Sequence, residues 1–215
     1  MILSDREVRA ALERGALRIT PDPRTDASLW SSTAVDLRLD EPLNTWVFPA
    51  EKAPRYFAPG DPAYDLPTLI GQFLRPVART DEGFLIQPGH FYLGWTQERI
   101  QLPHRSRLAA RVEGKSSLAR LGLGVHVTAP TIHAGFGATD LDPSFAGNPI
   151  QLEIWNTGPL PVLLRPGLAI CQLIFEWVDG TPEQGYRGQF AVQGPETLPP
   201  SPTTPARPSR KRRPH

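Results

Sequence analysis

Short apolar-rich runs, separated by proline and glycine turns, constrain the fold of this chain more than any other feature. After Gly83 these runs are Phe84 to Ile86, Phe91 to Trp95, Val125 to Ala129, Ile150 to Trp155, Val162 to Leu164 and Ala169 to Trp177. A period of two places successive side chains on opposite faces of a strand. Many short strands with frequent turns are typical of β-barrels and jelly rolls. The sequence therefore predicts an all-β fold.

A short amphipathic helix is predicted before the strands. Ser4 and Glu7 fit a capping box, and Val8, Ala11 and Leu12 recur at helical spacing. We expect this helix to cover one end of the core. Residues 41–81 are instead rich in proline, glycine and aromatic residues. We expect them to form an irregular excursion from the sheets.

The 215 residues, of which 40% are hydrophobic, are enough for one domain with a real core. We expect residues 1–193 to form that domain. From residue 194 onward, seven prolines and hydrophilic residues replace any apolar period. Residues 194–215 are therefore predicted to be a disordered, proline-rich basic tail.

Positive charge is concentrated in this tail. It holds five basic residues: Arg207, Arg210, Lys211, Arg212 and Arg213. Removing these five from the formal charge of +1 leaves the rest of the chain at −4. Nucleic-acid binding is therefore not expected, except weakly through the tail. The alternative is a solvated tail with no role.

The single cysteine, Cys171, excludes an intrachain disulfide and a Cys-x-x-Cys metal knuckle. Charged residues occupy the N-terminal segment, which lacks the apolar core of a signal peptide. No run approaches the ~18 apolar residues of a membrane span. We expect a cytoplasmic protein without a membrane partner.

One turn has the residue types of an anion site. A cation (Lys115), two hydroxyls (Ser116 and Ser117) and a guanidinium (Arg120) lie within six residues, directly after a predicted strand. Either serine is a good N-cap for one helical turn, and backbone N–H groups there suit phosphate oxygens. The alternative is an ordinary capped turn whose two basic side chains face solvent.

Several separate motifs resemble the dCTP deaminase family of the dUTPase-like superfamily. In the family's order they are Met1 to Arg6, Val35 to Leu39, Glu113 to Leu123, His126 to Ala129, Gln151 to Glu153, Asn156, Arg165 to Gly167, and Gln172 with Leu173. The resemblance covers nearly all of the chain up to about Gln189. It implies a distorted β-barrel or jelly roll of the dUTPase-like type. It also implies a homotrimer with sites between subunits and dCTP as substrate.

The resemblance also assigns roles to residues. Glu153 matches the family's catalytic glutamate. The expected substrate-binding residues are Lys115, Ser116, Ser117 and Arg120 for the triphosphate, Ala129 and Gln151 at the base, His133 at the sugar, and Tyr186 and Gln189 in a C-terminal lid. Mg²⁺ would bind through phosphate oxygens and water, because no carboxylate cage is visible in the sequence.

A zinc mechanism does not fit the sequence. Many nucleobase deaminases hold zinc through an H-x-E and P-C-x-x-C signature. This chain has one cysteine, and none of its five histidines is followed two positions later by glutamate. If the chain deaminates cytosine, a side chain must activate water without a metal, and a carboxylate near the base is the natural choice. The resemblance makes Glu153 that carboxylate, which would move the water proton to N3 and a proton to the leaving amino group. Without the resemblance, Glu153 would be interpreted as a surface strand residue.

Three positions depart from the family pattern. Lys115 stands where arginine is usual, His133 stands where aspartate is common, and Gly185 replaces a lysine of some members. In dUTPases that aspartate serves hydrolysis, and histidine cannot be an always-anionic base. The longer connection Gly137 to Pro149 carries Asp140 and Asp142, which we interpret as loop residues rather than metal ligands.

The sequence thus predicts a zinc-free dCTP deaminase that forms dUTP and ammonia and supplies dUTP for dTTP synthesis. One alternative is a dUTP diphosphatase or a bifunctional deaminase–diphosphatase. Another is a nucleotide-binding regulator without turnover.

Overall fold

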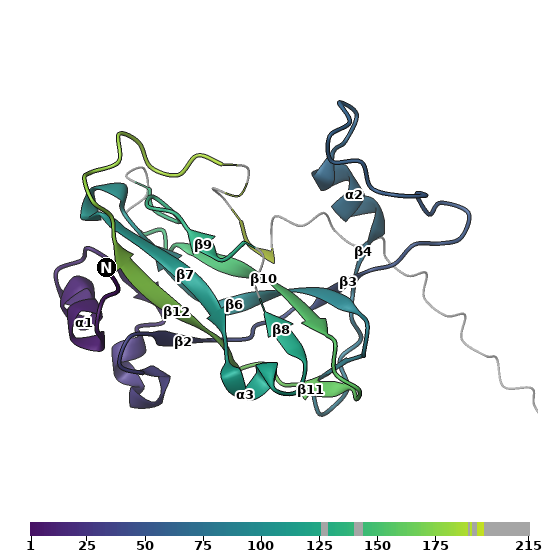
Figure 1. Ribbon diagram of the computed structural model, residues 1–215, viewed down its shortest axis with the longest axis horizontal. Helices are drawn as coiled ribbons and strands as arrows, with labels where there is room; N and C mark the ends of the chain where they lie inside the picture. The colour runs from purple at the N-terminus through teal and green to yellow at the C-terminus, as the bar shows by residue number, and fades with distance from the viewer. Residues whose placement is uncertain (126–128, 140–143, 189, 191–192, 196–215) are drawn as a thin grey trace, which may run out of the picture.

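The structure is a computed structural model that describes residues 1–125, 129–139, 144–188, 190 and 193–195. Within these residues the strands form two main sheets and a short two-stranded ribbon (Figure 1). Every pairing is antiparallel. The prediction of an all-β fold is confirmed.

The larger sheet has the order β4-β3-β6-β10-β8, with β1 added to β6. Its strands are β1 (Arg18–Thr20), β3 (Asn44–Trp46), β4 (Leu74–Pro76), β6 (Phe91–Gln101), β8 (Leu123–Val125) and β10 (Asn148–Asn156). The second sheet has the order β2-β12-β7-β9. Its strands are β2 (Val35–Arg38), β7 (Leu108–Gly114), β9 (Thr131–Ile132) and β12 (Ala169–Trp177). The ribbon pairs β5 (Phe84–Ile86) with β11 (Val162–Leu164).

The inner faces of the two main sheets share one hydrophobic core. Leu37 on β2 and Phe175 on β12 belong to the same buried cluster as Ile100 on β6 and Leu152 on β10. Each of these side chains is fully buried. Burial of apolar surface between the sheets is the main force that holds them together.

The predicted N-terminal helix is α1 (Asp5–Glu13), which lies beside the edge of the second sheet (Figure 1). Ser4 is its N-cap, and the Ser4 hydroxyl accepts a hydrogen bond from the Glu7 backbone N–H at 3.4 Å. Val8, Ala11 and Leu12 are buried, as their spacing predicts. Short 3₁₀ turns follow or separate strands at Pro23–Thr25, Ala27–Leu29 and His104–Ser106.

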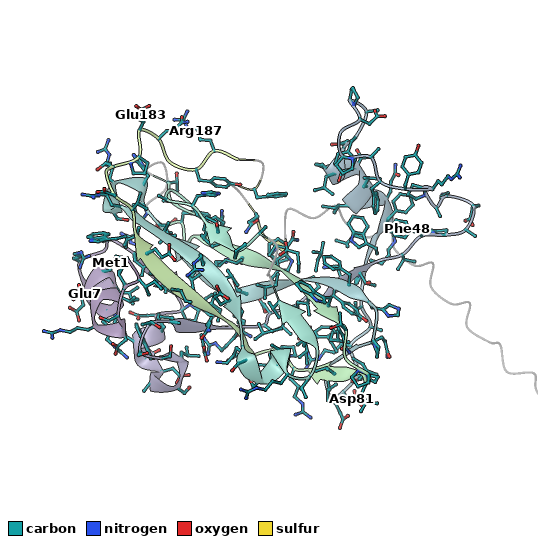
Figure 2. All side chains as sticks on the ribbon, viewed as in Figure 1. Met1, Glu7, Phe48, Asp81, Glu183 and Arg187 are labelled. Carbon is teal, nitrogen blue, oxygen red and sulfur yellow. The ribbon has the colours of Figure 1, made fainter. Side chains whose placement is uncertain are left out.

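The predicted excursion is more ordered than its composition suggests. Residues 47–73, which connect β3 to β4, project from the sheets as an arm that contains α2 (Leu66–Phe73) (Figure 1). Phe48 lies near the base of this arm (Figure 2) and packs on Phe73 with ring centroids 5.1 Å apart. The arm is therefore held by its own aromatic side chains.

Two predictions concern segments that the structure describes only in part. Of the predicted strand Val125 to Ala129, residues 126–128 lie outside them, and β8 ends at Val125. Residues 196–215 of the tail also lie outside them, so the domain boundary near residue 193 stays a prediction. No helix among the described residues is long and apolar enough to cross a membrane.

Candidate active site

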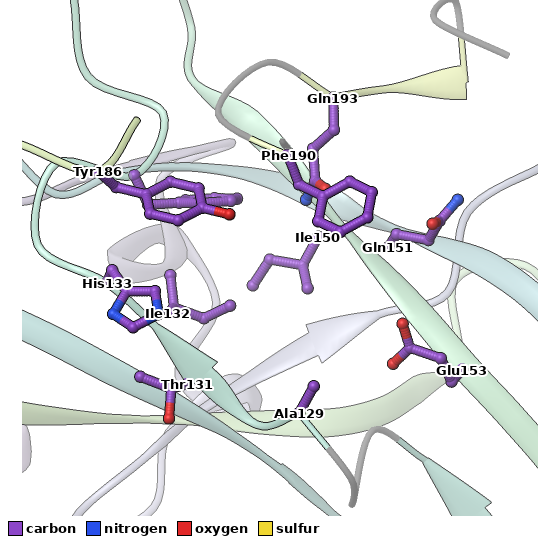
Figure 3. A pocket seen from close by; sticks show the side chains of 11 residues that line it. Ala129, Thr131, Ile132, His133, Ile150, Gln151, Glu153, Tyr186, Phe190 and Gln193 are labelled. Atoms are coloured by element: carbon purple, nitrogen blue, oxygen red, sulfur yellow. The ribbon is translucent and has the colours of Figure 1, made fainter. Parts of the chain in front are cut away.

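A cavity of about 240 Å³ lies between β9, the polar face of β10 and the segment after β12 (Figure 3). Five residues that the sequence assigns to the site line this cavity: Ala129, His133, Gln151, Glu153 and Tyr186. They come from three separate parts of the chain. The fold thus brings together the predicted base-binding, sugar-binding and catalytic positions.

Side chains on β10 point alternately to its two faces, and this alternation places Glu153 at the cavity. Ile150, Leu152 and Ile154 are buried in the core, whereas Gln151 and Glu153 are half-buried on the opposite face. Residues two apart on one face of a strand are separated by about 7 Å. The carboxylate of Glu153 points into the cavity (Figure 3), and its Oε2 atom is shielded from solvent. The predicted orientation of this strand is confirmed.

The backbone under Glu153 is well anchored. Glu153 lies opposite Leu93 of β6, while the next residue, Ile154, lies opposite Val125 of β8. The backbone N–H of Ile150 also donates a 2.9 Å hydrogen bond to the buried hydroxyl of Thr96. A carboxylate on a central strand is held in a narrow range of positions, as acid–base chemistry requires.

Two rings form another wall of the cavity. The imidazole of His133 and the phenol ring of Tyr186 stack with centroids 5.2 Å apart and planes 16° from parallel. The Tyr186 backbone N–H donates to the carbonyl of Ala134 at 3.0 Å. At Gly135, with φ +97°, an added Cβ would lie 2.4 Å from that same nitrogen. Glycine at this position therefore permits the two segments to approach each other.

The end of the described chain closes the cavity. Phe190 and Gln193 line it, and the Gln193 side-chain amide donates to the carbonyl of Pro149 at 3.0 Å. Sequence reasoning missed both residues because no period or motif marks this segment. The predicted lid residue Gln189 lies outside the described residues.

The predicted phosphate turn lies apart from this cavity. It forms α3 (Ser116–Ala119), and neither Lys115, Ser116, Ser117 nor Arg120 lines the cavity. Along β7, Thr131 beside the cavity pairs with Arg111, and Lys115 follows four residues later. Four residues of extended strand span about 13 Å.

The local structure of the turn differs from the prediction in one respect. Lys115, in extended backbone, is the N-cap of α3, and no side chain caps the helix. The prediction of a serine N-cap is therefore wrong. Ser116, Ser117 and Arg120 are exposed. The first helical donor is the N–H of Leu118, so the helix does not use the N–H groups of Ser116 and Ser117.

Lys115 already has an anionic partner. Its ammonium group contacts the carboxylate of Asp36 on β2. The side chains of Lys115 and Asp36 are 27% and 14% exposed, so this pair is partly shielded from water. Any phosphate at this turn would share the lysine with Asp36, whereas Arg120 has no such competitor among the described residues.

Cys171 is not a candidate nucleophile. It is fully buried on β12, and this burial, with a smaller contribution from the charge of Glu98, raises the pKa of its thiol far above the ordinary range. A thiol that stays protonated is a weak nucleophile. No group of three or more His, Cys, Asp or Glu side chains that could hold a metal ion occurs among the described residues. Asp140 and Asp142 lie outside those residues.

Comparison with known proteins assigns this chain to a family. The family model described as dCTP deaminase-like matches residues 2–178. The chain belongs to the dCTP deaminase-like family. This confirms the family resemblance inferred from the motifs. The match includes both α3 and Glu153, whereas Tyr186 and the segment after it lie beyond the matched residues.

Curated relatives of this dCTP deaminase-like chain match it over most of both lengths. A protein of Beutenbergia cavernae named "dCTP deaminase, dUMP-forming" is 42% identical and covers 89% of this chain and 93% of its own. A protein of Rhodospirillum rubrum named "dCTP deaminase" is 36% identical and covers 94% of this chain and 96% of its own. Only the first of these two names states a product, dUMP.

A solved structure has the same fold. The crystal structure of 2'-deoxycytidine 5'-triphosphate deaminase from Agrobacterium tumefaciens matches with a TM-score of 0.54 and 24% identity, over 81% of this chain and 47% of that one. The predicted fold class is therefore confirmed for a dCTP deaminase-like chain.

Proposed function

We propose that this protein is a dCTP deaminase that converts dCTP and water to dUTP and ammonia, with Glu153 as its general acid–base group. One observation carries the proposal: the Glu153 carboxylate, on a central strand, points into a cavity bounded by His133 and Tyr186. The names of the curated relatives support dCTP as the substrate.

Glu153 acts on the attacking water and on the leaving group. As a carboxylate it accepts a proton from water, and the resulting hydroxide adds to C4 of the cytosine. The protonated carboxyl then gives a proton to N3. Glu153 then takes the proton of the new C4 hydroxyl and passes it to the amino group, which leaves as ammonia while the C4 carbonyl forms. A positioned group of this kind contributes about 10²–10⁴-fold to rate.

The other residues of the cavity hold the nucleoside. The Gln151 side-chain amide and the backbone at Ala129 hydrogen-bond the edge of the base. His133 hydrogen-bonds the sugar hydroxyl, and its stack with Tyr186 fixes the plane of the imidazole. These roles follow from the lining of the cavity and from the family resemblance.

The triphosphate is held by α3 of a neighbouring protomer, and the protein is a homotrimer with its sites between subunits. The separation of α3 from the Glu153 cavity supports this arrangement, because one protomer does not present both groups to one cavity. The exposed Ser116, Ser117 and Arg120 remain available to a nucleotide bound on an adjacent chain. Guanidinium groups bind phosphate through paired, charge-assisted hydrogen bonds.

Catalysis uses Mg²⁺ but no zinc. Mg²⁺ retains water ligands and usually binds together with substrate phosphates, so the triphosphate and water supply its ligands here. Metal analysis of the purified, active protein should find no stoichiometric zinc. One tightly held zinc per chain whose removal stops turnover would contradict the zinc-free mechanism.

A second candidate is a deaminase that releases dUMP. It is favoured by the name of the Beutenbergia cavernae relative and several others. His133 favours dUTP as the product, since a histidine replaces the aspartate that serves hydrolysis in dUTPases. A neutral imidazole attracts a water proton less strongly than a carboxylate held permanently as an anion.

One set of incubations tests these alternatives. The protein is incubated with dCTP, CTP, dCMP and dUTP, and ammonia, pyrophosphate and nucleotide products are separated. The proposal expects ammonia and dUTP from dCTP without pyrophosphate. Pyrophosphate with dUMP would establish the dUMP-forming activity. Nucleotide binding without ammonia would instead establish a regulator.

A further inference from the structure

A second cavity, of about 280 Å³, lies beside the candidate active site. It is bounded by the 3₁₀ turn His104–Ser106 and by residues 185–187 of the segment after β12. Tyr186 lines both cavities and so forms part of the boundary between them. Neither the proposed deamination nor the proposed triphosphate site uses the remainder of this second cavity.

The second cavity is strongly basic. Its lining includes His104, Arg105 and Arg187, and the described residues that line it include no acidic side chain. Within the described part of the chain, neither guanidinium group has a hydrogen bond or an ion pair. Arg187 is exposed and lies at the outer edge of the molecule (Figure 2). Two unpaired guanidinium groups beside one cavity favour an anionic ligand.

The backbone that carries these side chains is anchored. Gly135 donates through its N–H to the carbonyl of Leu102 at 2.6 Å, and Tyr186 donates to Ala134 at 3.0 Å. A Cβ added at Gly185 would lie 3.4 Å from Nδ1 of His104. Glycine at 185 thus leaves the space beside this nitrogen free of a side chain of its own.

The chemistry of the lining, rather than the size of the cavity, limits the ligand. Two planar guanidinium groups and an imidazole match the oxygens of a phosphate or diphosphate. We propose that this cavity binds a free phosphate-type anion, inorganic phosphate or diphosphate, independently of the nucleotide in the Glu153 cavity.

Binding can be followed at His104 itself. Imidazole signals of the intact, ¹³C-labelled protein are recorded by NMR during titration with sodium pyrophosphate, and the His104 signal is identified with His104→Gln. The same titration is repeated on Arg120→Ala, in which the proposed triphosphate turn is impaired. We expect the His104 signal to shift in a saturable manner in both the wild-type protein and Arg120→Ala.

The double variant Arg105→Gln/Arg187→Gln removes the proposed anion ligands. Both side chains are exposed, and an unchanged Tm would show that the fold is intact. We expect its affinity for pyrophosphate at His104 to fall by about tenfold or more. A His104 signal that does not move in the wild-type protein, or that moves equally in the double variant, would overturn the proposal.

A kinetic comparison distinguishes a free anion from the phosphates of bound dCTP, and this part rests on the proposed function. Without added anion, the double variant should have the KM for dCTP of the wild-type protein. A KM raised as in Arg120→Ala would mean that the cavity serves the substrate's own triphosphate, which would overturn binding of a free anion. The NMR titration does not require turnover, so the two proposals can fail separately.

Discussion

The Glu153 cavity and the α3 turn, which the sequence joins in one predicted site, differ in almost every physical respect. Glu153 projects from a central strand, is half-buried and lies in a cavity with other predicted residues. The α3 turn is one short helix after β7, and three of its four predicted phosphate ligands are exposed. The first region is largely complete within one protomer, whereas the second has donors that face outward. The difference supports the proposal that each catalytic site combines two chains.

The largest expected effect is at Glu153. Glu153→Gln keeps nearly the same size and hydrogen-bonding reach but cannot accept the proton of water. Ammonia release from dCTP should fall by about 10²–10⁴-fold or more while dCTP binding survives. Calorimetry and an ammonia assay on the same preparation measure the two quantities.

Glu82→Gln is a matched control for this substitution, because Glu82 is exposed and its described hydrogen bonds, to Thr80 and Arg165, use only backbone atoms. It should retain wild-type turnover. Near-wild-type activity in Glu153→Gln would contradict the mechanism. Loss of both binding and assembly would instead make Glu153 a structural residue.

A smaller effect, mainly on KM, is expected at the turn. Arg120→Ala removes charge-assisted phosphate contacts worth about 1.5–3 kcal/mol each, so KM for dCTP should rise by about 10–100-fold with a modest change in kcat. Arg14→Ala, at another exposed arginine, should change neither constant. Unchanged kinetics in Arg120→Ala would mean that this segment is an ordinary solvent-exposed turn.

Tyr186 tests how the His133 ring is held in the cavity. Tyr186→Ala removes the stacked ring, and aromatic pairs are worth about 0.5–1.5 kcal/mol beyond area burial. The KM for dCTP should therefore rise by about 2–10-fold. Tyr186→Phe keeps the ring and should resemble the wild-type protein. Equal effects of both substitutions would show that the phenol hydroxyl, rather than the stack, is important.

The smallest effect is expected from the tail. Truncation after Pro195 removes the proline-rich basic residues but leaves Phe190 and Gln193 at the cavity. Assembly and turnover should stay within about twofold of the full chain, because exposed terminal segments tolerate removal. A large loss of kcat would show that the functional C-terminal segment extends further.

The sequence predicts the strands well where turn residues flank a clear apolar run. Val162–Leu164 and Ala169–Trp177 have the predicted limits, since turn residues bound each apolar run. Glu153 is likewise on the predicted face, because a period of two leaves one choice of face once the apolar residues are buried.

Other features depend on tertiary contacts that local patterns do not encode. The helix α3 begins after Lys115 rather than at a capping serine, because Lys115 already has the extended backbone of an N-cap. The stack of Tyr186 on His133 joins segments more than fifty residues apart, and no spacing rule predicts it. The absence of α3 residues from the lining of the Glu153 cavity depends on the three-dimensional paths of the strands, which local patterns do not give.

Assemblies that mix two variants test most directly whether each catalytic site combines Glu153 of one chain with the α3 turn of another. Glu153→Gln and Arg120→Ala proteins are unfolded together, refolded as an equal mixture and assayed at dCTP well below KM, with each variant refolded alone as the control. In a trimer with shared sites, about one quarter of the sites combine an intact Glu153 with an intact neighbouring Arg120. The account predicts recovery of about one quarter of wild-type activity. If mixed trimers form and activity stays at the level of the separate variants, the shared-site account is contradicted.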